Sequence, residues 1–189
     1  MKAFLDLLVA ALSSLTSTGI RWLGEWTGAA TDWFWLTFGE ELVILDEHSV
    51  ISKLAVSTLC GALLGLEREY AAKPAGLRTN IFICAGSTLF TLASIIAWQV
   101  YTGANPPSDP MRVAAQIVTG VGFLGAGVIF KSEEGITGIT TASTIWFVAA
   151  IGMMIAIGFP LLGFLISVVA TGLLFALGRV ERSFPSLPK

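Results

Sequence analysis

The sequence predicts an all-α membrane protein: a polytopic transmembrane helix bundle with five spans, preceded by an amino-terminal amphipathic or sixth helix. Hydrophobic residues make up 54% of the 189 residues and charged residues only 13%, which lies outside the usual composition of soluble domains. Two long stretches, residues 79–108 and 135–178, contain no charge. Because a hydrocarbon core of about 30 Å requires about 20 helical residues, we expect most of this chain to lie in lipid.

Five segments qualify as spans, and Lys53 is the only charged residue inside them. The longest uncharged stretch is divided at Gly158-Phe159-Pro160, where proline removes a helical donor and glycine tolerates unusual dihedral angles. We expect one membrane domain over residues 49–179 and a short cytoplasmic tail over residues 180–189. The spans are residues 50–66, 79–101, 113–130 and two helices within residues 135–178.

Basic residues predict the orientation of the spans, since cytoplasmic connections carry an excess of lysine and arginine. Leaving the amino-terminal region aside, one side of the membrane receives only Lys53 and Arg112. We therefore expect the opposite side, with the 67–80 hairpin and the carboxy terminus, to be the cytoplasm, and the 101–110 loop to lie outside. The basic residues on the cytoplasmic side are Arg68, Lys73, Arg78, Lys131, Arg179, Arg182 and Lys189.

The amino-terminal segment, residues 1–48, is rich in tryptophan and allows two interpretations. Its longest uncharged run, residues 7–20, has fourteen residues with five hydroxyl groups, so it is short and polar for a span. Residues 3–26 can form an amphipathic helix in the membrane interface or a sixth span, and the sequence leaves both open. Four tryptophans suit an interfacial belt: Trp22, Trp26, Trp33 and Trp35.

Charge and composition argue against several classes of function. A formal net charge of −2 gives no basic surface for nucleic acid, and the single histidine, His48, argues against a histidine-based metal site. The spans contain no paired aspartates and no serine–histidine arrangement, so we expect no enzymatic activity. Cys60 and Cys84 fall within spans, where each is expected to be a small packing residue.

The polar hairpin between the first two spans, residues 67–80, is the first candidate functional region. Glu67 ends the first span, where a carboxylate faces the negative end of the helix dipole, so it should be held by a cation. Arg68, Lys73 and Arg78 are all within reach along the hairpin. These residues suit either a salt-bridged clamp that fixes two spans together or a cytoplasmic site for an ion or a partner.

Turn and cap residues mark where the second and third spans begin. Pro74 and Gly76 supply the turn of the hairpin, and Thr79 or Asn80 can cap or line the start of the second span. Asp109 is followed by a proline, so we expect it to cap the third span.

The third span carries a polar stripe and many glycines. Arg112 opposes the helix dipole in the first turn, so it should have a specific partner. The stripe should face into the bundle, either for interhelical hydrogen bonds or as a polar crevice for an ion or water; it contains Arg112, Gln116, Thr119, Phe123 and Gly127. Close helix packing is expected at Gly61 and Gly65 in the first span and at Gly120, Gly122, Gly125 and Gly127 in the third.

Several short motifs, taken in order, resemble the blocks of a known membrane protein family. They are residues 65–69 (GLERE), 73–80 (KPAGLRTN), 112–118 (RVAAQIV), 120–127 (GVGFLGAG) and 138–142 (GITTA) with Trp146. In this order and spacing they resemble the MgtC/SapB family, over about residues 50 to 178, and in particular a short SapB-like form without the soluble carboxy-terminal domain. The resemblance makes the following residues candidates for function: Glu67, Arg68, Pro74, Gly76, Arg78, Thr79, Asn80, Arg112, Gln116, Thr119, Gly122, Gly125, Gly127, Thr140 and Thr141.

The resemblance implies a multi-pass protein of the bacterial inner membrane, linked to magnesium homeostasis, to growth at low magnesium and, in pathogens, to survival inside host cells. Members are described as magnesium transporters or as regulators of other membrane machinery, including the ATP synthase. The one cofactor this suggests is Mg2+, for which Glu67, Asn80 and Asp109 are the candidate ligands. Expected partners are the lipid bilayer and either further copies of the chain, a dimer being favoured, or another membrane protein.

The residues themselves favour the regulator over the transporter. Magnesium prefers oxygen ligands in a strict octahedron, but the acids between residues 50 and 178 all lie at span edges or in loops. Glu67 and Asp109 are expected on opposite faces of the membrane, so they cannot share one ion. A carbonyl-lined pore stays compatible with the sequence. The acids concerned are Glu67, Glu69, Asp109, Glu133 and Glu134.

Overall fold

The computed structural model describes residues 31–34, 36, 39, 46, 48–100, 109, 111–133 and 135–183. Two compact units make up the chain, residues 1–48 and residues 49–189. In the first unit, the described residues 31–34 are helical. The expected amphipathic or sixth helix at residues 3–26 lies outside the described residues, as do residues 101–108 of the expected outer loop and residues 184–189 of the expected tail.

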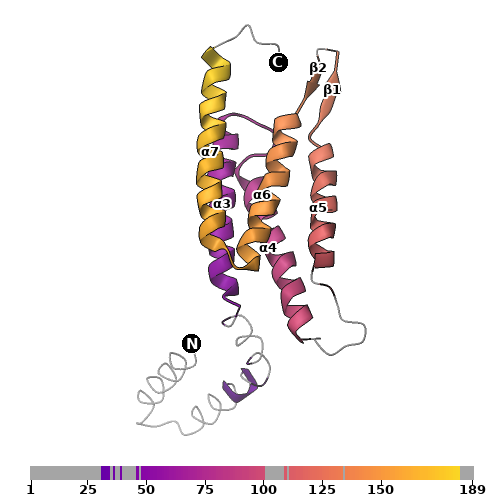
Figure 1. Ribbon diagram of the computed structural model, residues 1–189, viewed down its shortest axis with the longest axis vertical. Coiled ribbons are helices and arrows are strands. Elements are labelled where there is room, and N and C mark those ends of the chain that lie inside the picture. The colour runs from indigo at the N-terminus through magenta and orange to yellow at the C-terminus, as the bar shows by residue number, and fades with distance from the viewer. Residues whose placement is uncertain are drawn as a thin grey trace, which may run out of the picture. The chain divides into compact units, whose positions relative to one another are not determined.

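The second unit is built from long helices and one small hairpin (Figure 1). In chain order its elements are α3 (Val50–Tyr70), α4 (Leu77–Val100), α5 (Met111–Ala126), β1 (Phe130–Ser132), β2 (Gly135–Thr137), α6 (Ile139–Ile157) and α7 (Pro160–Ser183). Four helices, α3, α4, α6 and α7, are long and apolar enough to cross a bilayer, and α5 is a shorter apolar helix. The predicted all-α polytopic bundle is confirmed.

The third expected span is shorter than the sequence predicts. Residues 113–130 read as one helix, whereas α5 ends at Ala126 and Phe130 begins β1. β1 and β2 pair in antiparallel register, with Phe130 opposite Thr137. Gly138, at φ 90°, returns the chain so close to Val128 that a Cβ on the glycine would lie 1.9 Å from the Val128 carbonyl oxygen. Strands of three residues leave almost no periodic signal, so the apolar pattern alone did not reveal this hairpin.

Two helices extend beyond their predicted ends. α3 continues to Tyr70, so Glu67 and Arg68 lie in its last turns rather than in a loop. α7 continues to Ser183, past the domain end predicted at residue 179. In both cases no proline separates the apolar span from the polar residues that follow, so the helix continues out of the apolar region.

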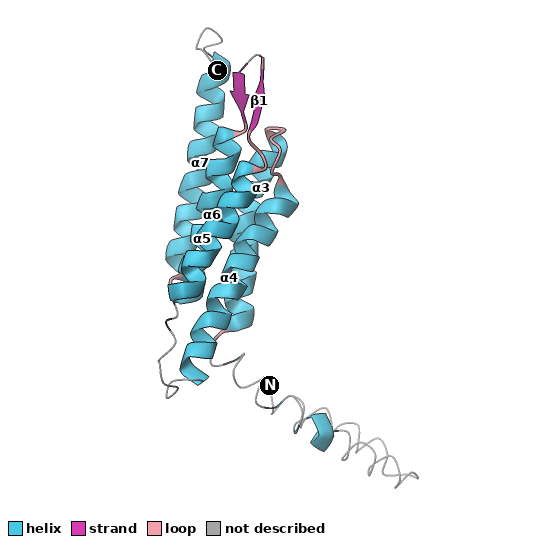
Figure 2. Cartoon of the chain, turned by 90° about the vertical axis from the view of Figure 1, so that its right-hand side faces the viewer, coloured by secondary structure: helices cyan, strands magenta, loops and turns pink. Residues whose placement is uncertain are grey.

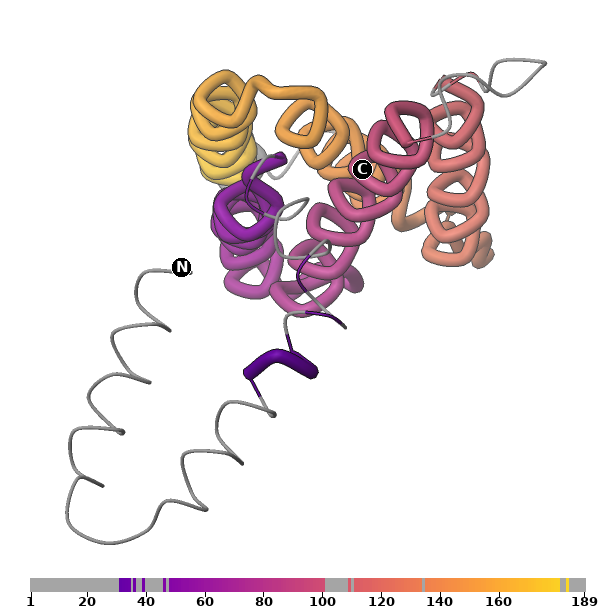
Figure 3. The backbone as a smooth tube through the Cα atoms, turned by 90° about the horizontal axis from the view of Figure 1, so that it is seen from below, coloured from indigo at the N-terminus to yellow at the C-terminus, as the bar shows by residue number. Residues whose placement is uncertain are grey.

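The bundle is centred on α3, α4 and α6, with α5 packed against α6 and α4 and with α7 packed against α3 and α6 (Figures 2 and 3). Glycine permits the closest approach between α3 and α4. A Cβ at Gly61 would lie 2.7 Å from the carbonyl oxygen of Asn80, and a Cβ at Gly65 would lie 2.8 Å from the Cα of Leu77. The glycine pair that the sequence assigned to close packing therefore forms the α3–α4 interface.

Candidate functional site

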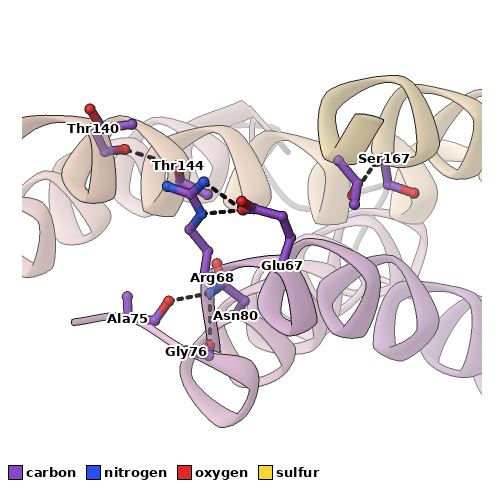
Figure 4. Close-up of polar contacts among 9 residues, drawn as sticks. Glu67, Arg68, Ala75, Gly76, Asn80, Thr140, Thr144 and Ser167 are labelled. Atoms are coloured by element: carbon purple, nitrogen blue, oxygen red, sulfur yellow. Dashed lines mark hydrogen bonds and ion pairs between the residues drawn. The ribbon is translucent and has the colours of Figure 1, made fainter. Parts of the chain in front are cut away.

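The end of α3 and the start of α4 enclose a small buried polar cluster (Figure 4). The Nε of Arg68 donates a hydrogen bond to the Oε2 of Glu67, and Nη2 of the same arginine forms an ion pair with that oxygen. The side chains of Arg68 and Glu67 are only 4% and 8% exposed. The cation expected beside Glu67 is therefore its immediate neighbour, while Lys73 and Arg78 point outward as exposed residues.

Asn80 ties the connecting loop to α4. Its Nδ2 donates to the carbonyl oxygens of Ala75 and Gly76, both at 2.8 Å, and the residue is fully buried. Asn80 therefore lines the start of α4, as the sequence suggested. The cap on the first turn comes instead from Glu69, whose Oε2 accepts a hydrogen bond from the backbone N–H of Leu77 at 3.0 Å.

Three further residues of the hairpin differ in their role. Thr79 is exposed, so it does not contribute to the buried cluster. Gly76 leaves no space for a side chain, because a Cβ there would lie 1.8 Å from the Oε2 of Glu69. Pro74 is exposed at the outer side of the loop. The loop is thus held from inside by Asn80 and from outside by Glu69.

Two buried atoms of the cluster have no hydrogen-bond partner among the described residues. They are the Nη1 of Arg68, a donor, and the Oδ1 of Asn80, an acceptor. Glu67 and Arg68 together carry no net charge, and the carboxylate already has a guanidinium beside it. This arrangement suits a neutral ion pair within the end of α3 better than a cation site.

The three candidate magnesium ligands do not come together. Glu67 and Asn80 lie at the end of the bundle where α3 meets α4, whereas Asp109 precedes α5 at the opposite end (Figure 1). Asp109 caps α5 as expected, since its Oδ1 accepts a hydrogen bond from the N–H of Met111 at 2.9 Å. Within the part of the chain that the structure describes, no three His, Cys, Asp or Glu side chains are grouped to hold a metal ion.

The polar stripe of the third span faces the opposite way from its prediction. Arg112, Gln116 and Thr119 are exposed on the surface of α5, and Phe123 is 81% exposed. The prediction that this stripe faces into the bundle is wrong. The face of α5 that packs inward is instead apolar and consists of Ala114, Ile117, Val121 and Gly125.

The glycines of the third span divide between these two faces. A Cβ at Gly125 would lie 3.6 Å from the Cβ of Ala142, so this glycine lies in the contact with α6. Gly120 and Gly122 have no atom within 4 Å of the Cβ position. Gly127 follows the last residue of α5 and donates its N–H to the carbonyl oxygen of Phe123, so it ends the helix rather than packing against another. Close packing is therefore observed only at Gly125.

The buried hydroxyl group of Thr88 joins two helices, a contact that the sequence analysis did not predict. The Oγ1 of Thr88 donates to the carbonyl oxygen of Gly152 at 2.9 Å, which links α4 to α6. Thr141 and Thr144 are almost fully buried, whereas Thr140 is exposed and its carbonyl oxygen accepts from Thr144. A signal was present in α4, because its buried hydroxyls recur at helical spacing: Ser87, Thr88, Thr91 and Ser94.

Lys53, the only charge inside an expected span, also has a defined partner. Its Nζ donates to the carbonyl oxygen of Ala156 at 3.0 Å, next to the end of α6. A cation there satisfies a helix-end carbonyl and the negative end of the dipole.

We expect Lys53→Met, which keeps the apolar stem, to lower the free energy of unfolding by about 1 kcal/mol. The measurement is thermal or denaturant unfolding of the purified protein in detergent. Ser52→Ala is the matched control, because the Ser52 hydroxyl bonds only within its own helix turn, to the carbonyl oxygen of Ser49. Equal stability of the two variants would show that Lys53 does not support α6.

Comparison with known proteins places this geometry in a family. The sequence profile described as the MgtC family matches residues 54–183, which is more than half of the chain. The chain belongs to the MgtC family. The matched region includes the Glu67–Arg68 pair, Asn80 and the whole of α5, so both regions described above lie within it. No solved structure matches the chain.

Individual relatives agree with the family assignment. The protein named "Putative magnesium transporter YhiD" of Escherichia coli strain K12 is 45% identical over 115 residues, which cover 60% of this chain and 53% of the relative. "Protein MgtC" of Salmonella typhimurium strain LT2 is 42% identical over 108 residues, covering 57% and 43%. An uncharacterised Haemophilus influenzae protein is 42% identical over 117 residues, covering 60% and 49%. This MgtC-family chain therefore spans about half the length of the curated relatives it matches.

Proposed function

We propose that this MgtC-family protein serves magnesium homeostasis in a bacterial inner membrane, during growth at low magnesium, by binding a protein partner within the membrane rather than by conducting magnesium. The name of the relative YhiD supports the link to magnesium. The distribution of basic residues supports a cytoplasmic position for the α3–α4 loop, the β1–β2 hairpin and the end of α7, which lie at one end of the bundle (Figure 1). Labelling of Lys73→Cys from the cytoplasmic side alone tests that orientation.

The observation that carries the proposal is the outward face of α5. Arg112 and Gln116 are exposed there on a helix of a membrane bundle, and polar side chains that meet lipid are unfavourable unless another protein covers them. Contact with a protein partner supplies the missing hydrogen-bond partners. A transport pathway would instead place polar groups toward the interior of the bundle, and the inward face of α5 is apolar.

The buried cluster supports the same conclusion. A magnesium ion approaching Glu67 would meet the guanidinium of Arg68, which already holds the carboxylate. Like charges in a poorly solvated site repel strongly. The pair therefore leaves the buried end of α3 without net charge, while Asn80 and Glu69 hold the loop that leads into α4.

Magnesium uptake by the purified protein in liposomes is the direct test. We expect no uptake above that of protein-free vesicles when a fluorescent magnesium indicator is enclosed. Uptake well above that background would overturn the proposal, and its loss in Glu67→Gln would assign Glu67 to the ion pathway. A known magnesium channel in the same vesicles shows that the assay detects transport.

Growth in low-magnesium medium tests the partner-binding part. In a host lacking its own MgtC-family gene, we expect the wild-type chain to restore growth and Arg112→Leu/Gln116→Leu to fail while reaching the membrane at normal levels. Phe90→Leu is the matched control, because Phe90 is 64% exposed on α4 and is apolar. Full growth with the α5 variant would remove the observation on which the proposal rests.

A further inference from the structure

The polar side chains on the outward face of α5 indicate which partner binds there. α5 lies at the edge of the bundle, where it contacts α6 and α4 (Figure 3). Arg112 and Gln116 lie one helical turn apart on this face, and both are exposed. Neither side chain has a hydrogen bond or an ion pair with any described residue of the chain.

Lipid alone does not satisfy this face. Arg112 lies in the first turn of α5, so its long side chain can reach the membrane surface. Gln116 lies one turn deeper, about 6 Å further along the helix axis, and its shorter side chain has no such route. Its amide offers two donors and two acceptor positions, and inside the hydrocarbon region these groups need a polar partner.

We propose that the partner is a second copy of this chain, with the two α5 helices packed side by side around a two-fold axis parallel to them. In such an isologous contact each residue meets the same surface of the other copy. The amide of Gln116 is self-complementary, since the carbonyl of one copy accepts from the NH2 group of the other. Two symmetric hydrogen bonds then satisfy the buried part of the polar face.

Charge complementarity supports the same occupant. Asp109 and Arg112 are both exposed at the start of α5, and they are separated by one helical turn. Across a two-fold axis Arg112 of each copy can therefore face Asp109 of the other, and two ion pairs form without a residual charge. Asp109 retains one carboxylate oxygen for this purpose, because its cap to the N–H of Met111 uses Oδ1.

One glycine of α5 allows the two backbones to approach. Gly120 follows Gln116 by one helical turn and has no atom of its own chain within 4 Å of its Cβ position, so it presents open backbone beside the polar face. Gly122, two residues further along, is directed to another side of the helix. Small residues at such positions are typical of helix contacts in membranes. This inference deepens the proposed function, and it rests on the proposal that α5 binds a protein.

Cysteine cross-linking in native membranes tests the contact. In a Cys60→Ala/Cys84→Ala background, we expect Thr119→Cys, on the polar face, to give a disulfide-linked dimer on mild oxidation. Val169→Cys is the matched control, because Val169 is 70% exposed on α7 and lies outside the proposed contact. Equal cross-linking at the two positions would overturn the two-fold contact through α5.

Charge reversal provides a second test that a general loss of stability cannot imitate. We expect Asp109→Arg to reduce the dimer fraction, counted by single-molecule photobleaching in nanodiscs, at least fivefold. Asp109→Arg/Arg112→Asp should restore the dimer, since the pairs reform with opposite sign although the cap at position 109 stays lost. A double variant as monomeric as the single one would overturn the proposed pairing.

The two proposals fail in different ways. If Thr119→Cys cross-links only to an unlike membrane protein, the second-copy inference falls and the partner-binding function stands. If the wild-type chain transports magnesium in liposomes yet forms the α5 dimer, the proposed function falls and the dimer contact is confirmed.

Discussion

Replacing Gly152 with leucine is expected to have the largest effect on the stability of the bundle. A Cβ at this position would lie 2.3 Å from the carbonyl oxygen of Cys84 and 3.1 Å from the Cβ of Ser87. The first obstacle is backbone, so α4 and α6 must move apart. That movement also breaks the hydrogen bond from the Thr88 hydroxyl to the carbonyl oxygen of Gly152. We expect a loss of about 3 kcal/mol or more, seen as a lower melting temperature or as loss of monodisperse protein in detergent.

Gly172→Leu is the control for this prediction. Gly172 is also a helical glycine, on α7, but no atom lies within 4 Å of its Cβ position and the residue is exposed. The two variants add the same side chain and remove the same backbone freedom. If Gly152→Leu melts at the temperature of Gly172→Leu, then α4 and α6 do not make the close contact described here.

The sequence predicted the spans well because their signal is local. A long uncharged stretch and a Gly-Phe-Pro break are visible without knowledge of any partner. Gly61 and Gly65 could be assigned to packing since both lie on one helix at the right spacing. The role of Gly152 depends on Cys84 and Thr88, which are more than sixty positions away in the chain, so no local pattern identified it.

The candidate site was predictable only in part, for a similar reason. The charge of Glu67 required a nearby cation, and that rule offered Arg68, Lys73 and Arg78, of which the structure pairs Arg68 with Glu67. The direction of the α5 stripe was predicted wrongly, because the rule that polar groups in a membrane bundle face its interior applies to the whole assembly and not to a single chain. Arg112 and Gln116 instead point away from the bundle. The face of α5 that packs inward, against α6, is formed by apolar residues. The periodic pattern of one sequence shows which residues share a helix face, but not whether that face contacts the same chain or another one.

The second large effect is expected from removal of the cation in the buried cluster. Arg68→Met leaves the carboxylate of Glu67, only 8% exposed, without the guanidinium that neutralises it. Removal of one member of a buried ion pair lowers stability by about 3–5 kcal/mol. We therefore expect a large drop in the free energy of unfolding, measured by denaturant titration in detergent at neutral pH. Arg78→Met is the matched control, since Arg78 belongs to the same end of the bundle and is exposed, and its loss should change stability by less than about 1 kcal/mol.

The double variant Glu67→Gln/Arg68→Met separates the ion pair from every other contact of the arginine. Without a charge in the cluster, the penalty of an unpaired carboxylate disappears, so the double variant should recover most of the stability lost by Arg68→Met. Such coupling between neighbours is what a double-mutant cycle measures. If the double variant is as unstable as the single one, the Glu67 carboxylate is not what Arg68 stabilises. Arg68 would then stabilise the bundle through the packing of its side chain, which is only 4% exposed.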